Sequence, residues 1–169
     1  MNTETFNQNV QWNLEQIAVQ VGHAEQVKTR ARSGYYKSAV ILAAAIVEAL
    51  AYKVLEKNNT LKMPMEDWHC VRSNFLPQQY KSDKGERLSI CERTRSEFKL
   101  NKQTDFKKVN EVCLDLKIIS KKLFNKIEKI RKLRNKIHIQ GLDNLDRSYT
   151  KSELEFISSA MNELLGKIQ

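Results

Sequence analysis

The segment from Tyr35 to Lys57 is apolar around almost its whole circumference when it is drawn as a helix. Its apolar residues recur at helical spacing, with small residues between them, and they include Val40, Ile41, Ala44, Val47, Ala51, Val54 and Leu55. A helix that is apolar on all sides is stable in water only where other elements cover it. This segment is therefore predicted to be the central helix of a bundle.

Glycine and proline are too scarce for a β-rich fold, since the 169 residues include five glycines and two prolines. A sandwich or barrel needs turn residues at regular intervals. Hydrophobic residues make up 41% of the chain, which is enough for one core. We therefore expect one mainly α domain over residues 1–169, built as a bundle of five or six helices.

Five further helices are expected from apolar residues at helical spacing and from capping residues. Gly34 is expected to end the first of them, Thr104 and Ser120 to cap two others, and Thr150 with Glu153 to form a capping box. The expected ranges are about residues 5–32, 65–75, 104–116, 120–140 and from 150 onward.

Residues 87–100 show a different pattern. Leu88 and Ile90, and then Phe98 and Leu100, alternate with polar residues on either side of a polar turn. Alternation with a period of two is typical of strands. The pattern predicts a small β-hairpin inserted into the helical domain.

The chain is expected to stay in the cytoplasm, without contact to a membrane. Its longest uncharged apolar run, Ala39 to Val47, is stopped by Glu48, well short of the roughly 20 residues that span a bilayer. The N-terminus lacks the basic and apolar regions of a signal peptide. The three cysteines show no C-x-x-C spacing, and we interpret them as free thiols.

Positive charge is concentrated between Lys117 and Gln140. This segment has nine basic residues and one acid, Glu128, so it carries +8 of the net charge of +9. Such a concentration on a helix is typical of proteins that bind a polyanion, with nucleic acid ahead of an anionic membrane surface. A solvated basic face that binds nothing specific remains the alternative.

Several kinds of chemistry lack their sequence motifs. Neither a glycine-rich phosphate loop nor a G-x-S-x-G elbow occurs. The histidines at 23, 69 and 138 do not have the spacing of metal ligands. We therefore expect no nucleotide cofactor and no metal.

One group of residues near the end of the basic segment stands out. At 100° per residue, Arg131 and His138 are nearly eclipsed on a helix, Asn135 lies one turn from each, and Arg134 lies one turn before His138. In a purely structural interpretation, both arginines pair with acids of neighbouring helices, and His138 is stabilised by the helix C-terminus.

The stretch KIRKLRNKIHIQG resembles the R-x(4 to 6)-H signature of HEPN-domain proteins. The segment SGYYKSAVILAAAIVEALAYKVL resembles the buried second helix of that family, including a glutamate, Glu48, inside the apolar run. Two positions depart from the family pattern. Arg134 has only three residues between it and His138, and Gln140 stands where toxins silenced by nucleotidylation have a tyrosine.

The resemblance implies metal-independent RNA cleavage in which a histidine, here His138, transfers protons around the ribose 2′-hydroxyl. It also implies that an arginine stabilises charge on the scissile phosphate. An imidazole with a pKa near 6.5 and a guanidinium fork suit these tasks. The expected catalytic residues are His138, Arg131, Arg134 and Asn135, and the expected RNA-binding residues are Lys129, Lys132 and Lys136.

Glu48 needs a cationic partner, because a carboxylate inside so apolar a helix cannot stay charged and unpaired. Arg134, which is turned towards the apolar stripe of its helix, is the best candidate, and this leaves Arg131 for the phosphate. In the HEPN family two copies of the motif usually face each other across a dimer. This chain has one copy, so a homodimer is expected to complete the site.

Two functions remain open. The first is an endoribonuclease, acting as the toxin of a toxin–antitoxin pair or as a phage-defence effector, with an antitoxin or regulatory protein as a further partner. The second is a non-catalytic HEPN-like module that binds RNA or a protein through the same basic helix.

Overall fold

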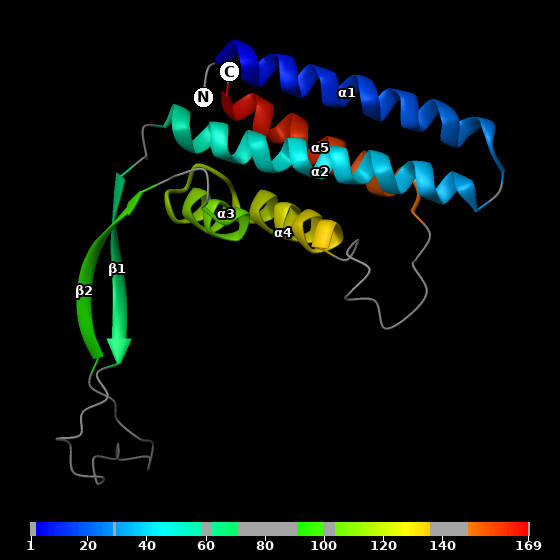
Figure 1. Ribbon diagram of the computed structural model, residues 1–169. Helices are drawn as coiled ribbons and strands as arrows, with labels where there is room; N and C mark the ends of the chain where they lie inside the picture. Colours follow the sequence, from blue (N-terminus) through cyan, green and yellow to red (C-terminus); the bar gives the residue numbers. More distant parts are fainter. Residues whose placement is uncertain are drawn as a thin grey trace, which may run out of the picture. The chain divides into compact units, whose positions relative to one another are not determined.

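The computed structural model describes residues 3–28, 30–58, 104–135 and 149–168, together with the backbone of residues 62–70 and 91–99. These residues belong to two compact units, one helical and one formed by two strands. The helices are α1 (Thr3–Gln26), α2 (Ala31–Lys57), α3 (Phe106–Asp115), α4 (Lys121–Asn135) and α5 (Lys151–Ile168). The predicted mainly α bundle is confirmed (Figure 1).

Helix α2 is the centre of the helical unit, as its sequence predicts. Eleven of its residues are buried, and it contacts all four other helices. Within the described unit α1 and α5 each pack on α2 and are linked to each other by the ion pair of Lys151 with Glu25, whereas α3 and α4 pack on each other and on α2 (Figure 1).

By length and composition alone, α2 is also apolar enough to cross a membrane. More than half of its most apolar window, 56%, is buried inside the helical unit. The core helix of a soluble protein passes the same test of length and composition. A signal sequence near the N-terminus passes it as well.

Local capping signals place two of the helix starts correctly. The hydroxyl of Ser120 accepts a hydrogen bond from the backbone N–H of Leu123 at 3.2 Å, which satisfies one of the unpaired donors at the start of α4. The carboxylate of Glu153 accepts the backbone N–H of Thr150 at 2.7 Å. This is the reciprocal half of the expected capping box.

Two other helix boundaries were predicted wrongly. Gly34 does not end the first helix, because α1 ends at Gln26 and Gly34 lies in the first turn of α2. Thr104 does not cap α3. Asp105 holds the N-cap position, and the carbonyl of Thr104 instead accepts a hydrogen bond from the hydroxyl of Tyr52.

The helix expected over residues 65–75 is wrong where the structure describes it. Residues Lys62–Cys70 form strand β1, which pairs antiparallel with strand β2 (Cys91–Lys99), so that Lys62 faces Lys99 and Cys70 faces Cys91. Pro64 is compatible with β1, because each strand of a two-stranded sheet has an edge that needs no N–H donor. The chain therefore contains an antiparallel strand pair, but its strands do not both come from the predicted range of residues 87–100. Leu88, Ile90 and Leu100, on which that prediction depended, lie outside the described residues.

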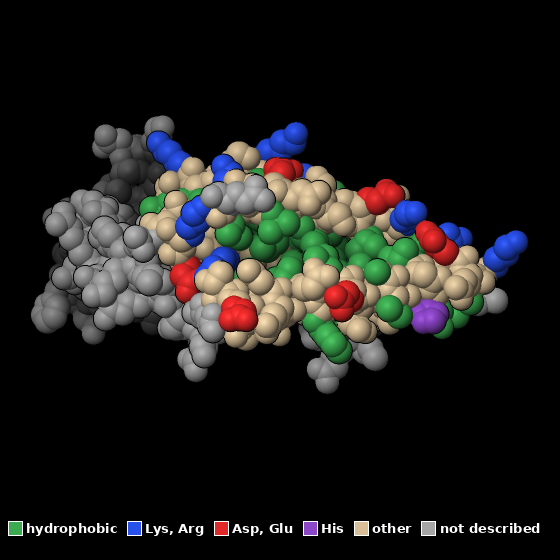
Figure 2. All heavy atoms as spheres, turned by 90° about the horizontal axis from the view of Figure 1, so that it is seen from above, with side chains coloured by type: hydrophobic (Ala, Val, Ile, Leu, Met, Phe, Trp, Pro, Cys, Tyr) green, Lys and Arg blue, Asp and Glu red, His purple; other side chains and the backbone are tan. Residues whose placement is uncertain are grey.

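Large hydrophobic side chains of the described residues remain exposed on α1 and α5. They are Trp12, Leu14, Val19 and Leu165. Figure 2 shows hydrophobic side chains gathered in a band on the face that carries these two helices. The apolar stripe expected on the first helix is thus only partly covered in a single chain.

Candidate functional site

Helix α4 has one buried face and one exposed cationic face. Leu123, Ile127 and Ile130 are buried, which confirms the described part of the predicted stripe. Most of the opposite face is lysine, and the exposed ones are Lys121, Lys122, Lys129 and Lys132. Rotation of 100° per residue places the last three within about 80° of one another, on the side away from the core.

These four lysines have no carboxylate partner at ion-pair distance among the described side chains. The ammonium group of Lys121 lies 4.5 Å from the centre of the Phe124 ring. By contrast, Lys126 already has partners on α5, because it forms an ion pair with Glu163 and donates a hydrogen bond of 2.9 Å to Ser159. The exposed lysine stripe therefore keeps its positive charge available for an anion.

Arg134 forms an ion pair with Glu48 of α2, which confirms the partner expected from the sequence. The nitrogen that makes the contact is Nη1, and the acceptor is Oε2. The pair is less buried than expected, since the side chains of Arg134 and Glu48 are 39% and 26% exposed. Glu48 is half-buried, on the side of α2 that meets Arg134 of α4.

Arg131 is paired within its own helix. Its Nε and Nη2 groups donate to the same oxygen, Oε2 of Glu128, at 3.0 and 2.9 Å. The side chains of Arg131 and Glu128 are 20% and 16% exposed, so water screens this pair less than the pair of Arg134 with Glu48. The hydrogen bonds that Arg131 donates to Glu128 raise the pKa of Arg131, so it remains a cation.

The carboxylate of Glu128 is also held from α3. The amide Nδ2 of Asn110 donates to Oε1 of Glu128 at 2.9 Å and to the backbone carbonyl of Phe124 at 3.3 Å. Burial alone would raise the pKa of Glu128, but the hydrogen bonds from Arg131 and Asn110 outweigh it and lower the pKa. Glu128 is therefore an anion with three donors around it.

Sequence reasoning did not assign a role to Glu128 or Asn110. For Glu128 a signal existed, because the one acid of the basic segment stands three residues before Arg131, and that spacing places side chains next to each other on a helix. For Asn110 the signal was a polar residue within the apolar stripe of α3, between the buried Val109 and Val112.

Not every expected site residue can be located. Asn135 is the last residue of α4 and is exposed. His138 and Lys136 lie outside the described residues, as does the expected end of the helix at Gln140. The described residues bring the two arginines onto one helix, each with a different carboxylate.

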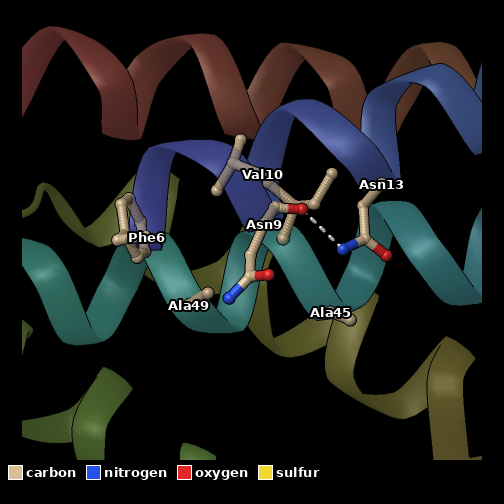
Figure 3. A pocket seen from close by; sticks show the side chains of 7 residues that line it. Phe6, Asn9, Val10, Asn13, Ala45 and Ala49 are labelled. Atoms are coloured by element: carbon tan, nitrogen blue, oxygen red, sulfur yellow. Dashed lines mark hydrogen bonds between the residues drawn. The ribbon is translucent and has the colours of Figure 1, made fainter. Parts of the chain in front are cut away.

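A small pocket lies between α1 and α2. It is lined by Phe6, Asn9, Val10, Asn13, Ala45, Ile46 and Ala49 (Figure 3). Ala45 is exposed, and Ala49 is half-buried. Glu48, which binds Arg134, lies between these two alanines in the sequence. An apolar surface therefore adjoins the ion pair.

The described residues contain neither a cluster of metal ligands nor a reactive thiol. No cluster of three His, Cys, Asp or Glu side chains there is arranged to hold a metal ion. Cys113 is a free thiol that is buried, and burial raises its pKa to about 12. A thiol with so high a pKa is not a nucleophile at neutral pH.

Comparison with known proteins finds no matching family model, no matching curated protein and no matching solved structure.

Proposed function

We propose that this chain is a metal-independent endoribonuclease of the HEPN type, which acts in the cytoplasm as a toxin or phage-defence effector. The 2′-oxygen of the RNA attacks the adjacent phosphorus, and the bond from phosphorus to the 5′-oxygen breaks. The products are a 2′,3′-cyclic phosphate and a 5′-hydroxyl. His138 takes the proton from the 2′-hydroxyl and a second imidazole, or the same one, gives a proton to the leaving oxygen.

The observation that carries this proposal is the cationic face of α4. Four exposed lysines without carboxylate partners share the helix with Arg131, whose outer guanidinium edge has no acceptor among the described residues. Lysines that are free of acids can bind phosphates of an RNA backbone, and a guanidinium edge matches two phosphate oxygens.

The two arginines are suited to different tasks. Arg134 uses Nη1, at the outer end of its guanidinium, for Glu48. Arg131 uses its Nε and Nη2 groups for Glu128, which leaves Nη1 for another acceptor. This difference supports Arg131 as the phosphate contact and Arg134 as a residue that fixes α4 against α2.

A homodimer would place two such sites together. The uncovered part of α2 around Ala45 is apolar, and it adjoins the ion pair of Glu48 with Arg134. A second copy on that surface would cover exposed apolar groups and bring the ends of two α4 helices together. An antitoxin or regulatory protein is a further proposed partner.

A non-catalytic HEPN-like module that binds RNA or a protein is the second candidate. The observation in its favour is that both arginines already have carboxylate partners. Asp105 and Glu111 also raise the pKa of Arg131, so the negative potential around it is larger than that of Glu128 alone. Such surroundings weaken the attraction of Arg131 for a phosphate.

One experiment separates these functions. Purified protein is incubated with total RNA in the presence of EDTA, and the ends of any fragments are mapped. The nuclease should give 2′,3′-cyclic phosphate ends, and His138→Ala should abolish the fragments while leaving the circular dichroism spectrum unchanged. RNA that stays intact but is retained on a filter would favour the binding module, and fragments that require a metal would refute the mechanism.

A further inference from the structure

Asn110 is fully buried, and it is the polar residue in the core of the described helical unit. Its Nδ2 group has two protons, and both have acceptors on α4: the carbonyl of Phe124 and the carboxylate of Glu128. A buried amide that bonds to two points of one helix holds that helix against the helix that carries the amide. It also fixes the carboxylate to which it donates.

Glu128 transmits this constraint because its two oxygens have different partners. Oε1 accepts from Asn110, and Oε2 accepts twice from Arg131. A carboxylate three residues before an arginine on an exposed helix normally rotates among several rotamers. Here the donor from the core removes that freedom, so the bonds from Arg131 end on an oxygen with a fixed position.

The outcome is a guanidinium group with a defined orientation. The Nε and Nη2 groups of Arg131 donate to Glu128, and its Nη1 group has no acceptor among the described residues. A planar guanidinium that is held along one edge presents the other edge without further loss of rotamer entropy. This is the preorganisation that a phosphate contact requires.

We infer that Asn110 is a positioning residue, which holds the guanidinium of Arg131 through Glu128 in the orientation that binds the scissile phosphate. This inference rests on the proposed ribonuclease function. Asn110 itself touches no RNA, since it is fully buried.

A double-mutant cycle distinguishes positioning from a general contribution to packing. The variants are Asn110→Leu, which keeps the branched shape of the side chain and removes both hydrogen bonds, Arg131→Ala, and the two combined. Asn110→Leu should lower kcat by a factor between about ten and a hundred with KM unchanged, because small displacements of a catalytic group cost that much. In the Arg131→Ala background the same change should have no further effect on kcat.

A matched control removes a different hydrogen bond from α4. Ser159→Ala deletes the hydrogen bond from Lys126 to Ser159 of α5 and leaves the ion pair of Lys126 with Glu163 in place. Neither contact involves Arg131. This control substitution should leave kcat unchanged, and it should not alter the coupling between Asn110 and Arg131 in the double-mutant cycle. If Asn110→Leu lowers kcat equally with and without Arg131, the residue supports only the fold, and the positioning role is refuted.

The orientation of Arg131 is also measured without RNA. In proton–nitrogen NMR spectra, the Nε–H signal of Arg131 should exchange slowly with water in the original protein and in Ser159→Ala. In Asn110→Leu it should exchange at the rate of a solvated arginine. Slow exchange in Asn110→Leu would overturn the inference. If the unsubstituted protein leaves RNA intact, the nuclease function is refuted, and this holds whatever the NMR spectra show.

Discussion

Glu48 and Arg134 are 86 residues apart in the chain and form an ion pair between α2 and α4. The pair lies at the rim of the helical unit, where both side chains keep contact with water. Its contribution to stability is therefore smaller than that of a fully buried pair, in which the loss of one partner leaves a charge in the core. Its position matters more, because α4 carries the proposed site.

Arg134→Ala should lower the free energy of unfolding by about 1 kcal/mol, the upper end of the range for exposed pairs, because both partners are partly solvated. Urea denaturation at pH 7 measures the change. Lys151→Ala is the control, since the pair of Lys151 with Glu25 is more than half exposed on both sides and should contribute less. A loss of 3 kcal/mol or more, roughly the value for a buried pair, would contradict this estimate.

Arg131→Ala should act mainly on cleavage. Removing a preorganised donor raises the activation barrier by about 2–4 kcal/mol, which single-turnover kinetics with a short RNA would detect. Arg134→Ala should retain more activity than Arg131→Ala. The opposite order would assign the phosphate contact to Arg134.

Glu128→Gln should change how stability depends on pH. The pKa of Glu128 is lower in the folded chain than in the unfolded one, so its contribution is fully present above the unfolded value, near 4.3. It is lost as the pH falls through the folded pKa. Urea titrations should therefore show Glu128→Gln less stable than the original protein at pH 6, with a smaller difference at pH 3. A difference that does not vary with pH would contradict this.

RNA binding should weaken steeply with salt. If the four exposed lysines each contact a phosphate of a single strand, the slope of log K against log salt is about −3. Replacing both Lys129 and Lys132 by alanine should reduce its magnitude by about 1.4. Lys126→Ala should leave the slope unchanged, because Lys126 is paired with Glu163. Fluorescence anisotropy at several salt concentrations provides these slopes, and equal slopes for all variants would exclude the lysine stripe as the interface.

Ala45→Arg should convert the proposed homodimer into a monomer, because it adds a long charged side chain to the uncovered surface of α2. Light scattering at micromolar concentration reports the mass. The matched control is Ala18→Arg, which changes an exposed alanine of α1 in place of one of α2. This variant should remain dimeric. A protein that is monomeric before any substitution would remove the composite site.

Features with a local or a strong energetic cause were predictable from the sequence. The caps at Ser120 and Glu153 depend on residues three positions away, and both are present. The pair of Glu48 with Arg134 was predictable because a charge in an apolar helix requires an opposite charge nearby.

Features that depend on distant partners were not predictable in the same way. Strand β1 forms because β2, beginning 21 residues beyond its end, offers a backbone to pair with, and nothing in residues 62–70 alone requires this. The hydrogen bond between Asn110 and Glu128 likewise depends on how α3 lies against α4. The spacing of residues in the sequence carries no information on how α3 is oriented against α4.

The contact of α2 with α5 has a consequence for synthesis on the ribosome. Helix α5 begins at Lys151, while α2 ends at Lys57, so 93 residues separate the central helix from one of the helices that cover it. At roughly 5–20 residues per second, translation needs about 5–20 s to supply them. During that interval one side of the most apolar helix of a nascent chain stays uncovered, and it is a natural binding site for a chaperone until synthesis is finished.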